Sequence, residues 1–205
     1  MASDADYVPG AGDFFQKLAK LYEDMDRQYE DTAAAYGFHC RGCRDNCCRT
    51  RFFHHTHIEA AYLLHGFSRL DAVSREAALQ RAREVRDAQE EGGPGSEQLM
   101  CPLNFGGWCI LYPYRPMICR LHGLAHELRV PGKPTTYGPG CMEFERIRGD
   151  LAYIPFDRTP FYIRMASLEQ EFKTFMGQPD RIRKTVAQII ADAADTTQTE
   201  ASRAQ

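Results

Sequence analysis

The sequence predicts a mainly α fold, in which a helical domain surrounds an irregular, cysteine-rich metal-binding lobe and contains at most a short hairpin. Three observations support this prediction. Apolar residues recur every three or four positions near both ends, eight cysteines lie between residues 40 and 141, and prolines and glycines interrupt residues 99–143. With 205 residues, 43% hydrophobic and 26% charged, the chain is long enough for a single domain, residues 1–205, with its own core.

An N-terminal helix is predicted over residues 10–36. Its apolar residues share one helical face, and Gly37 is a typical stop signal. The residues of this face are Phe14, Leu18, Leu21, Tyr22, Met25, Tyr29 and Ala33.

Two further helices are predicted before the middle of the chain. Thr56 and Glu59 have the spacing of a capping box, which indicates a helix start. From Ser74 to about Glu91 the chain is highly charged and its apolar side is thin, so we expect a solvated helix or arm there. Gly92 opens a glycine- and proline-rich break that ends it.

Residues 37–145 are predicted to form the cysteine-cluster region. From residue 99 to 143 the many prolines and glycines leave room for no more than one short hairpin, near Asn104–Tyr112. The same segment contains Trp108 and several other large apolar residues, and is therefore too apolar to be disordered. A bound metal would hold such a segment together, since metal binding contributes directly to folding.

Two more helices are predicted over residues 157–194. An apolar stripe runs from Phe161 to Phe175, and Gly177 and Pro179 mark the end of the first of these helices. Residues 195–205 are polar, and we expect them to form a flexible tail.

Three explanations exist for so many cysteines: disulfides, a soft metal or core packing. The N-terminal residues are acidic and contain no apolar run, so we expect no secretory signal and a cytoplasmic location, where thiols stay reduced. Cysteine makes up roughly 4% of the chain, below the ~8–10% of disulfide scaffolds. Metal ligation is therefore the favoured interpretation. The predicted metal ligands are Cys40, Cys43, Cys47, Cys48, Cys101, Cys109, Cys119 and Cys141.

The number of thiols suits either two four-thiolate sites or one site plus spectators. Cys40 and Cys43, separated by two residues, can reach one metal from a single turn. Structural Zn²⁺ takes four ligands, and a [4Fe–4S] cluster usually takes four thiolates. Adjacent side chains diverge, so Cys47 and Cys48 are expected to serve two nearby centres, or to divide between ligation and packing.

The cysteine pattern resembles the CxxCxxCC family of zinc- or iron-chelating proteins. The matching pieces lie within residues 40–141: Cys40-x2-Cys43-x3-Cys47-Cys48, Cys101-Pro102-Leu103, Cys109-Ile110-Leu111-Tyr112, Arg115-Pro116-x2-Cys119-Arg120 and Gly140-Cys141. One departure is that three residues, not two, separate Cys43 from Cys47. A fainter likeness is to the cysteine-rich part of flagellin lysine methylases, but the chain has no glycine loop for S-adenosylmethionine.

The resemblance implies an iron–sulfur cluster, [4Fe–4S], with zinc as the alternative. Arg115 and Arg120 flank Cys119 and are predicted to bind this cofactor, because guanidinium groups balance the charge of a thiolate site; plain solvation is the competing interpretation. His54, His55 and His57 follow the vicinal cysteines and are weaker candidates as ligands.

The remaining features limit the function without defining a reaction. A net charge of −3 and the lack of a long apolar run predict neither a nucleic-acid nor a membrane partner, and leave a redox or protein partner open. Hydrolase and phosphate-loop motifs are missing. We therefore expect a redox, electron-transfer or metal-handling protein. The alternative is a zinc-stabilised, non-enzymatic interaction module, and a protein-modifying enzyme is a weaker possibility.

Overall fold

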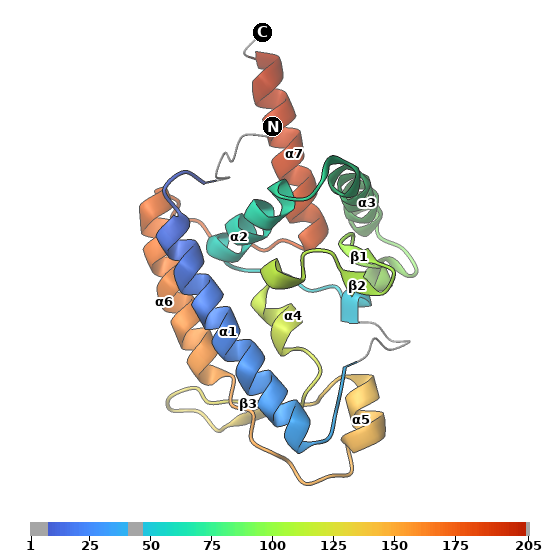
Figure 1. The fold of residues 1–205 in the computed structure, drawn as a ribbon, viewed down its shortest axis with the longest axis vertical. Coiled ribbons are helices and arrows are strands. Elements are labelled where there is room, and N and C mark those ends of the chain that lie inside the picture. Colours follow the sequence, from blue (N-terminus) through green and yellow to red (C-terminus); the bar gives the residue numbers. More distant parts are fainter. Residues whose placement is uncertain (1–7, 41–46, 204–205) are drawn as a thin grey trace. The chain divides into compact units, whose positions relative to one another are not determined.

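A computed structural model of the chain describes residues 8–40 and 47–203 and confirms the mainly α prediction (Figure 1). In this part of the chain, two short antiparallel hairpins accompany the helices. The chain divides into two compact units, which are described separately. Unit 1 contains residues 1–9, 48–115 and 180–205, and unit 2 contains residues 10–47 and 116–179. The single domain expected from the sequence stays a prediction.

Unit 1 is built from three helices around a common apolar core. They are α2 (His57–Ser68), α3 (Ala72–Glu91) and α7 (Val186–Arg203), with 3₁₀ turns η2 (Ser96–Gln98) and η3 (Tyr112–Tyr114) and the hairpin β1 (Asn104–Phe105) and β2 (Trp108–Cys109). A further 3₁₀ turn, η1 (Cys47–Arg49), spans the boundary between the units along the sequence. The core residues are Leu63, Leu64, Phe67, Ala78, Ala82, Leu103, Leu111, Val186, Ile189, Ile190 and Ala191.

Helix α2 begins where the capping-box spacing predicts. Thr56 is the N-cap residue, and its hydroxyl donates to the Glu59 carboxylate at 2.6 Å instead of accepting from a backbone amide. The pair therefore fixes the first turn through a contact between two side chains, a variant of the usual reciprocal arrangement.

The predicted hairpin forms within its expected range. Asn104 pairs with Cys109 and Phe105 with Trp108 across a two-residue turn. Both turn residues, Gly106 and Gly107, have positive φ, at 60° and 92°. Such a turn matches the twist of two paired strands but requires glycine-like backbone freedom.

Helix α3 is not the purely solvated helix that its charge predicts. It begins two residues before Ser74, with Asp71 as the cap that accepts the Ser74 amide at 2.9 Å. Ala78 and Ala82 are fully buried in the core that α7 also enters. Because these side chains are small, the thin apolar side of α3 is sufficient for close helix packing.

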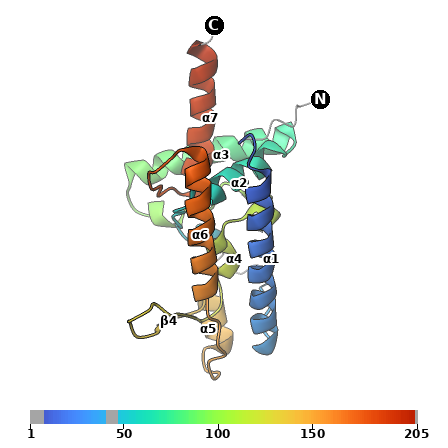
Figure 2. The same ribbon diagram turned by 90° about the vertical axis from the view of Figure 1, so that its left-hand side faces the viewer.

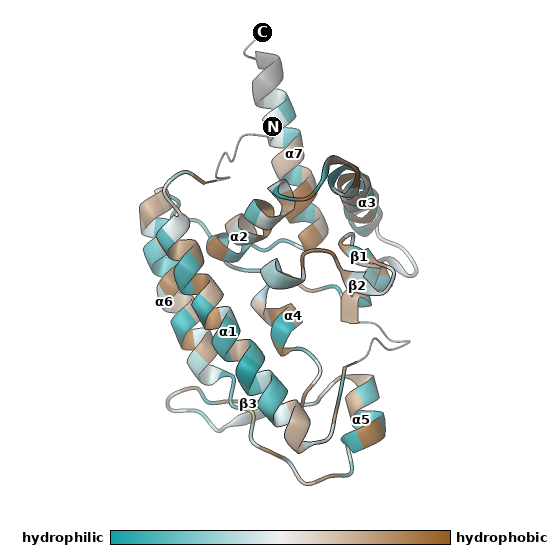
Figure 3. Ribbon diagram, in the orientation of Figure 1, coloured by the Kyte–Doolittle hydropathy of each residue, from teal (hydrophilic) through white to brown (hydrophobic). Residues whose placement is uncertain are grey.

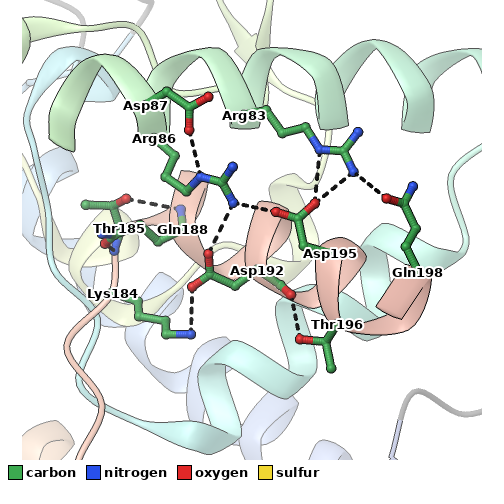
Figure 4. A network of polar contacts seen from close by, with 10 residues as sticks. All are labelled: Arg83, Arg86, Asp87, Lys184, Thr185, Gln188, Asp192, Asp195, Thr196 and Gln198. Atoms are coloured by element: carbon green, nitrogen blue, oxygen red, sulfur yellow. Dashed lines mark hydrogen bonds and ion pairs between the residues drawn. The ribbon is translucent and has the colours of Figure 1, made fainter. Parts of the chain in front are cut away.

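Charged residues join α3 to the second half of α7 (Figure 4). Arg86 lies 2.7 Å from Asp195 and 3.4 Å from Asp192, and Arg83 lies 2.9 Å from Asp195. Helix α7 continues to Arg203, through most of the segment where the sequence predicts a tail. The helix end expected near residue 194 is thus corrected, because carboxylates on α7 find cationic partners on α3.

Unit 2 contains the predicted N-terminal helix, α1 (Gly12–Ala35), packed against α6 (Thr159–Met176) and α4 (Met117–Leu121). Figure 2 shows α1 and α6 running alongside each other. Hydrophilic and hydrophobic residues alternate along both helices, as expected when one face of each is buried (Figure 3). Gly177 ends α6 in a left-handed conformation, in agreement with its predicted role.

The rest of unit 2 includes a second hairpin that the sequence does not predict. Strands β3 (His126–Leu128) and β4 (Thr136–Gly138) are antiparallel, and Glu127 also bridges Asp157 on the other side of β3. Helix α5 (Met142–Arg148) follows. Phe144 of α5 is buried edge-on against Tyr36 and Phe38, with ring centroids 4.9 and 5.3 Å away.

None of the helices in residues 8–40 and 47–203 has both the length and the apolar character required to cross a bilayer.

The charge network between α3 and α7 predicts a stability effect. Replacing Asp195 with Asn should lower the free energy of unfolding by about 1 kcal/mol, since two arginines lose a partly exposed carboxylate partner. Urea denaturation measures this difference, which should shrink in 1 M NaCl as salt screens the pairs. Asp87→Asn is the control, because Asp87 is itself exposed and, among the described residues, forms an ion pair only with its chain neighbour Arg86; an equal loss there would contradict the role given to α7.

Candidate metal centre

Three cysteines of unit 1 are brought together by backbone hydrogen bonds. The amide of Cys101 donates to the carbonyl of Cys48 at 2.8 Å, joining two segments that are distant in sequence. Asn104 then turns back on Cys101 through an amide-to-carbonyl bond of 3.0 Å. Asn104 is also the strand partner of Cys109. One bridge, one turn and one hairpin therefore fix the positions of Cys48, Cys101 and Cys109.

The Cys101 thiol is affected electrostatically by both of the other cysteines. Burial, together with the neighbouring Cys48 and Cys109 sulfurs, raises the pKa of the Cys101 thiol to about 12, although a hydrogen bond from the Leu103 amide acts to lower it. The residue as a whole is partly exposed. A thiol with a pKa this high stays protonated when no metal is bound, and a bound cation would favour its thiolate form.

Arg81 of α3 is the cation next to this cluster. Its guanidinium donates to the Asn104 carbonyl at 2.7 Å and to the Cys101 carbonyl at 3.5 Å, and lies 4.5 Å from the centre of the Phe105 ring. Its charge lowers the pKa of the Cys101 thiol, in opposition to burial. The sequence does not predict this role for Arg81, because the position of one arginine in a charged helix does not indicate which residues it contacts.

The cysteines of unit 1 also contribute to packing. Cys101 and Cys109 lie against the apolar core that includes Leu103 and Leu111. Small, polarisable thiols suit such positions, so burial by itself agrees with the core-packing interpretation. The proximity of Cys48, Cys109 and Arg81 to the Cys101 thiol is the feature that packing does not require.

The described cysteines of unit 2 occupy different local settings. Cys40 is exposed, whereas Cys119 lies within α4 and is partly buried, as is Cys47. Cys141 is the N-cap residue of α5: its sulfur accepts the Phe144 amide at 3.4 Å, and its own amide donates to the Gly123 carbonyl at 2.9 Å. The prediction for Cys43 lies outside the described residues.

The donor chemistry fits a soft metal, but the described geometry does not complete a ligand set. All seven described cysteines carry thiols. Sulfur donors favour zinc and iron–sulfur clusters. Within residues 8–40 and 47–203, however, no group of three or more His, Cys, Asp or Glu side chains is arranged to hold a metal ion. Cys48, Cys101 and Cys109 therefore form a partial set.

The two arginines predicted to bind a cofactor have well-defined surroundings. Arg115 of unit 1 stacks on the Tyr112 ring, with its guanidinium carbon 3.7 Å from the ring centre. Arg120 of unit 2 is buried, pairs with Asp26 at 2.5 Å and lies 4.0 Å from the Tyr22 ring centre. Asp26 and Tyr22 both belong to α1, so Arg120 fastens α4 to α1; a cofactor role for either arginine stays a prediction.

The histidines after the vicinal cysteines are distributed over several structural roles. His54 is buried and exchanges two backbone hydrogen bonds with Lys184, at 2.8 and 3.1 Å. The ring of His57 contacts the Asp180 carbonyl at 3.0 Å, and His55 is exposed. Burial lowers the pKa of His54, His55 lowers it further, and the carboxylate of Glu59 opposes this shift.

Comparison with known proteins finds no match for this chain. The chain matches no protein-family model, and searches of curated proteins and of solved structures find no significant similarity.

The buried imidazole of His54 predicts an acid-dependent loss of stability. The folded pKa lies below the ordinary value of 6.5, so the unfolded chain binds the proton first. Stability should therefore be full above pH 6.5 and fall as the pH decreases from there toward the folded pKa. Urea denaturation of the wild type and of His54→Gln at pH 7.5 and 5.5 measures the effect.

We expect the loss between these two pH values to be smaller in His54→Gln by about 1 kcal/mol, since one group contributes at most about 1.4 kcal/mol per pH unit. His65→Gln, on the surface of α2, is the matched control and should keep the wild-type pH dependence. An unchanged pH dependence in His54→Gln would show that His54 is not the responsible group.

Proposed function

We propose that this chain ligates an iron–sulfur cluster, [4Fe–4S], through its cysteines, and that it acts in the cytoplasm in a redox, electron-transfer or metal-handling role. The observation that carries the proposal is that Cys48 and Cys109 both lie near the buried Cys101 thiol in unit 1. The resemblance of the cysteine pattern to the CxxCxxCC family supports the choice of cofactor.

Each residue near these thiols has a part in this proposal. Cys48, Cys101 and Cys109 would hold the cofactor, which supplies one-electron chemistry when bound. Arg81 balances part of the negative charge of the thiolates and fixes the backbone of the Cys101–Asn104 turn. Leu103 and Leu111 are buried beside the cysteines and keep water from their inner side. Burial and charge of this kind tune the reduction potential of a cluster.

The vicinal pair has a simple assignment under this proposal. Cys48 belongs to the unit 1 thiols, while Cys47 falls in unit 2 together with Cys40, Cys119 and Cys141. Adjacent side chains that serve different ligand sets avoid the strained geometry of two neighbours on one ion. This assignment agrees with two cysteine sets rather than one.

The alternative proposal is a zinc-stabilised, non-enzymatic module that binds a protein partner. The structural observation in its favour is that Cys101 and Cys109 lie on a turn and a two-residue strand, elements too short to be stable alone. A structural zinc would fix them without any redox function.

Metal analysis of cysteine variants tests the proposal. Wild-type protein purified without oxygen should be brown and contain iron and acid-labile sulfide. Cys101→Ser and Cys109→Ser should each lose at least half of this iron, because serine replaces a soft thiolate with a poor ligand. Val73→Ser, an exposed change in unit 1, is the control and should keep the full iron content.

Colourless protein with stoichiometric zinc would replace the first proposal with the second. Iron or zinc content that is the same in Cys101→Ser, Cys109→Ser and wild type would contradict the assignment of these two ligands. Protein that contains neither metal would contradict both proposals.

A further inference from the structure

Among the described residues of unit 2, one buried arginine has no carboxylate partner. Arg158, the residue before α6, is only 4% exposed. One terminal nitrogen of its guanidinium donates to the carbonyl oxygens of Leu121 and Leu124, the latter at 3.2 Å. Its Nε is buried and makes no hydrogen bond to any described residue. The guanidinium is thus held in place by backbone groups that carry no net charge.

The other charged groups around Arg158 do not neutralise it. Burial lowers the pKa of Arg158 to about 10, so it remains a cation at neutral pH. The titratable groups that act on it are the phenols of Tyr29, Tyr153 and Tyr162, and none of these is a carboxylate.

Two acidic residues next to Arg158, Asp157 in the sequence and Glu127 through a backbone hydrogen bond, have partners of their own. Glu127 pairs with Arg129 at 2.9 Å, and Asp157 lies 3.6 Å from the same Arg129 while accepting the Thr159 amide at 2.9 Å. In the described part of unit 2, Arg158 therefore has no ion-pair partner. An unpaired buried charge is costly, so such a charge normally has a counter-ion.

Two imidazoles belong to the segment that Arg158 binds: His122 directly follows Leu121, and His126 comes two residues after Leu124. Burial lowers the pKa of both His122 and His126, and the positive charge of Arg158 lowers each further. Both rings are consequently neutral at neutral pH and retain an N–H donor. Both residues are partly exposed. The Nδ1 atom of His126 is buried and forms no well-aligned hydrogen bond to a described residue. The backbone of Leu124 lies beside this ring and acts to raise the pKa of His126.

The backbone keeps the His126 ring in position. His126 pairs across the hairpin with Gly138, where a Cβ atom would lie 2.4 Å from ring atom Cε1. Glycine at this position therefore leaves room for the imidazole to lie over β4. Strand pairing thus fixes the backbone of His126 beside the space that Gly138 leaves for the ring.

We propose that His122, His126 and Arg158 form a binding site for a small oxyanion, a phosphate or a carboxylate. The partly exposed imidazoles donate N–H bonds to the anion, and Arg158 supplies the positive charge that balances it. Hydrogen bonds to an ionised acceptor are stronger than neutral ones. The same positive charge repels cations, which distinguishes this site from the cysteine centre and makes it independent of the proposed function.

Calorimetric titration of the full-length protein with inorganic phosphate tests this site, at pH 7.5 and constant ionic strength set with chloride. We expect saturable binding of one phosphate per chain, and at least tenfold weaker binding in His122→Ala and in His126→Ala. Lys133→Ala is the control: Lys133 is an exposed cation in the same hairpin, and its loss should change affinity less than twofold.

A parallel titration with acetate distinguishes the two ligand classes, and tighter binding of either anion supports the site. Thermal unfolding of each variant checks that the fold is retained, and Arg158→Lys provides a second test because it keeps the charge while losing the guanidinium geometry. Absence of saturable binding for both anions, or equal affinities in wild type and in folded His122→Ala and His126→Ala, would overturn the proposal.

Discussion

The hydrogen bond between the Cys101 amide and the Cys48 carbonyl is the constraint on which the cysteine centre of unit 1 depends. A single bond of this kind contributes only about 1 kcal/mol, but it determines which thiols meet. It places the segment after the vicinal cysteines beside the turn that leads into the β1–β2 hairpin. The hairpin register then returns the chain so that Cys109 pairs with Asn104, and both Cys48 and Cys109 lie close enough to Cys101 to raise the pKa of its thiol.

Both units stabilise their irregular segments with an arginine that binds backbone carbonyls. In unit 1, Arg81 donates to the carbonyls of Cys101 and Asn104; in unit 2, Arg158 donates to those of Leu121 and Leu124. The guanidinium group suits this role because it presents several donors in a fixed plane. The two arginines differ in what else their charge faces, which is thiols in unit 1 and imidazoles in unit 2. The proposed chemistry of each unit follows from that difference.

The elements that the sequence predicts well are those with a local signal. The apolar stripe of α1, the start of α2 at Thr56, the Gly106–Gly107 turn and the Gly177 end of α6 each depend on residues within a few positions of one another. The structure confirms these elements because propensity, capping and packing agree.

The features that the sequence does not predict depend on partners far along the chain. Helix α7 extends past residue 194 because Asp195 meets Arg83 and Arg86 of α3, and α3 is packed because its alanines meet α7. The β3–β4 hairpin is only three residues per strand and gives no clear alternation. The role of Arg81 could not be predicted for the same reason, since it depends on a turn some twenty residues away. For the metal centre, the sequence predicts the donor type and leaves the metal and the ligand set as predictions.

X-ray absorption at the iron and zinc edges of anaerobically purified, full-length protein tests the central claim most directly. Ligation by cysteines predicts a first shell of sulfur scatterers at ~2.3 Å, with iron–iron scattering in addition if the metal is a cluster. A first shell made of nitrogen and oxygen alone, or the absence of both metals from the protein, would contradict a thiolate-bound metal and leave the converging cysteines as core residues.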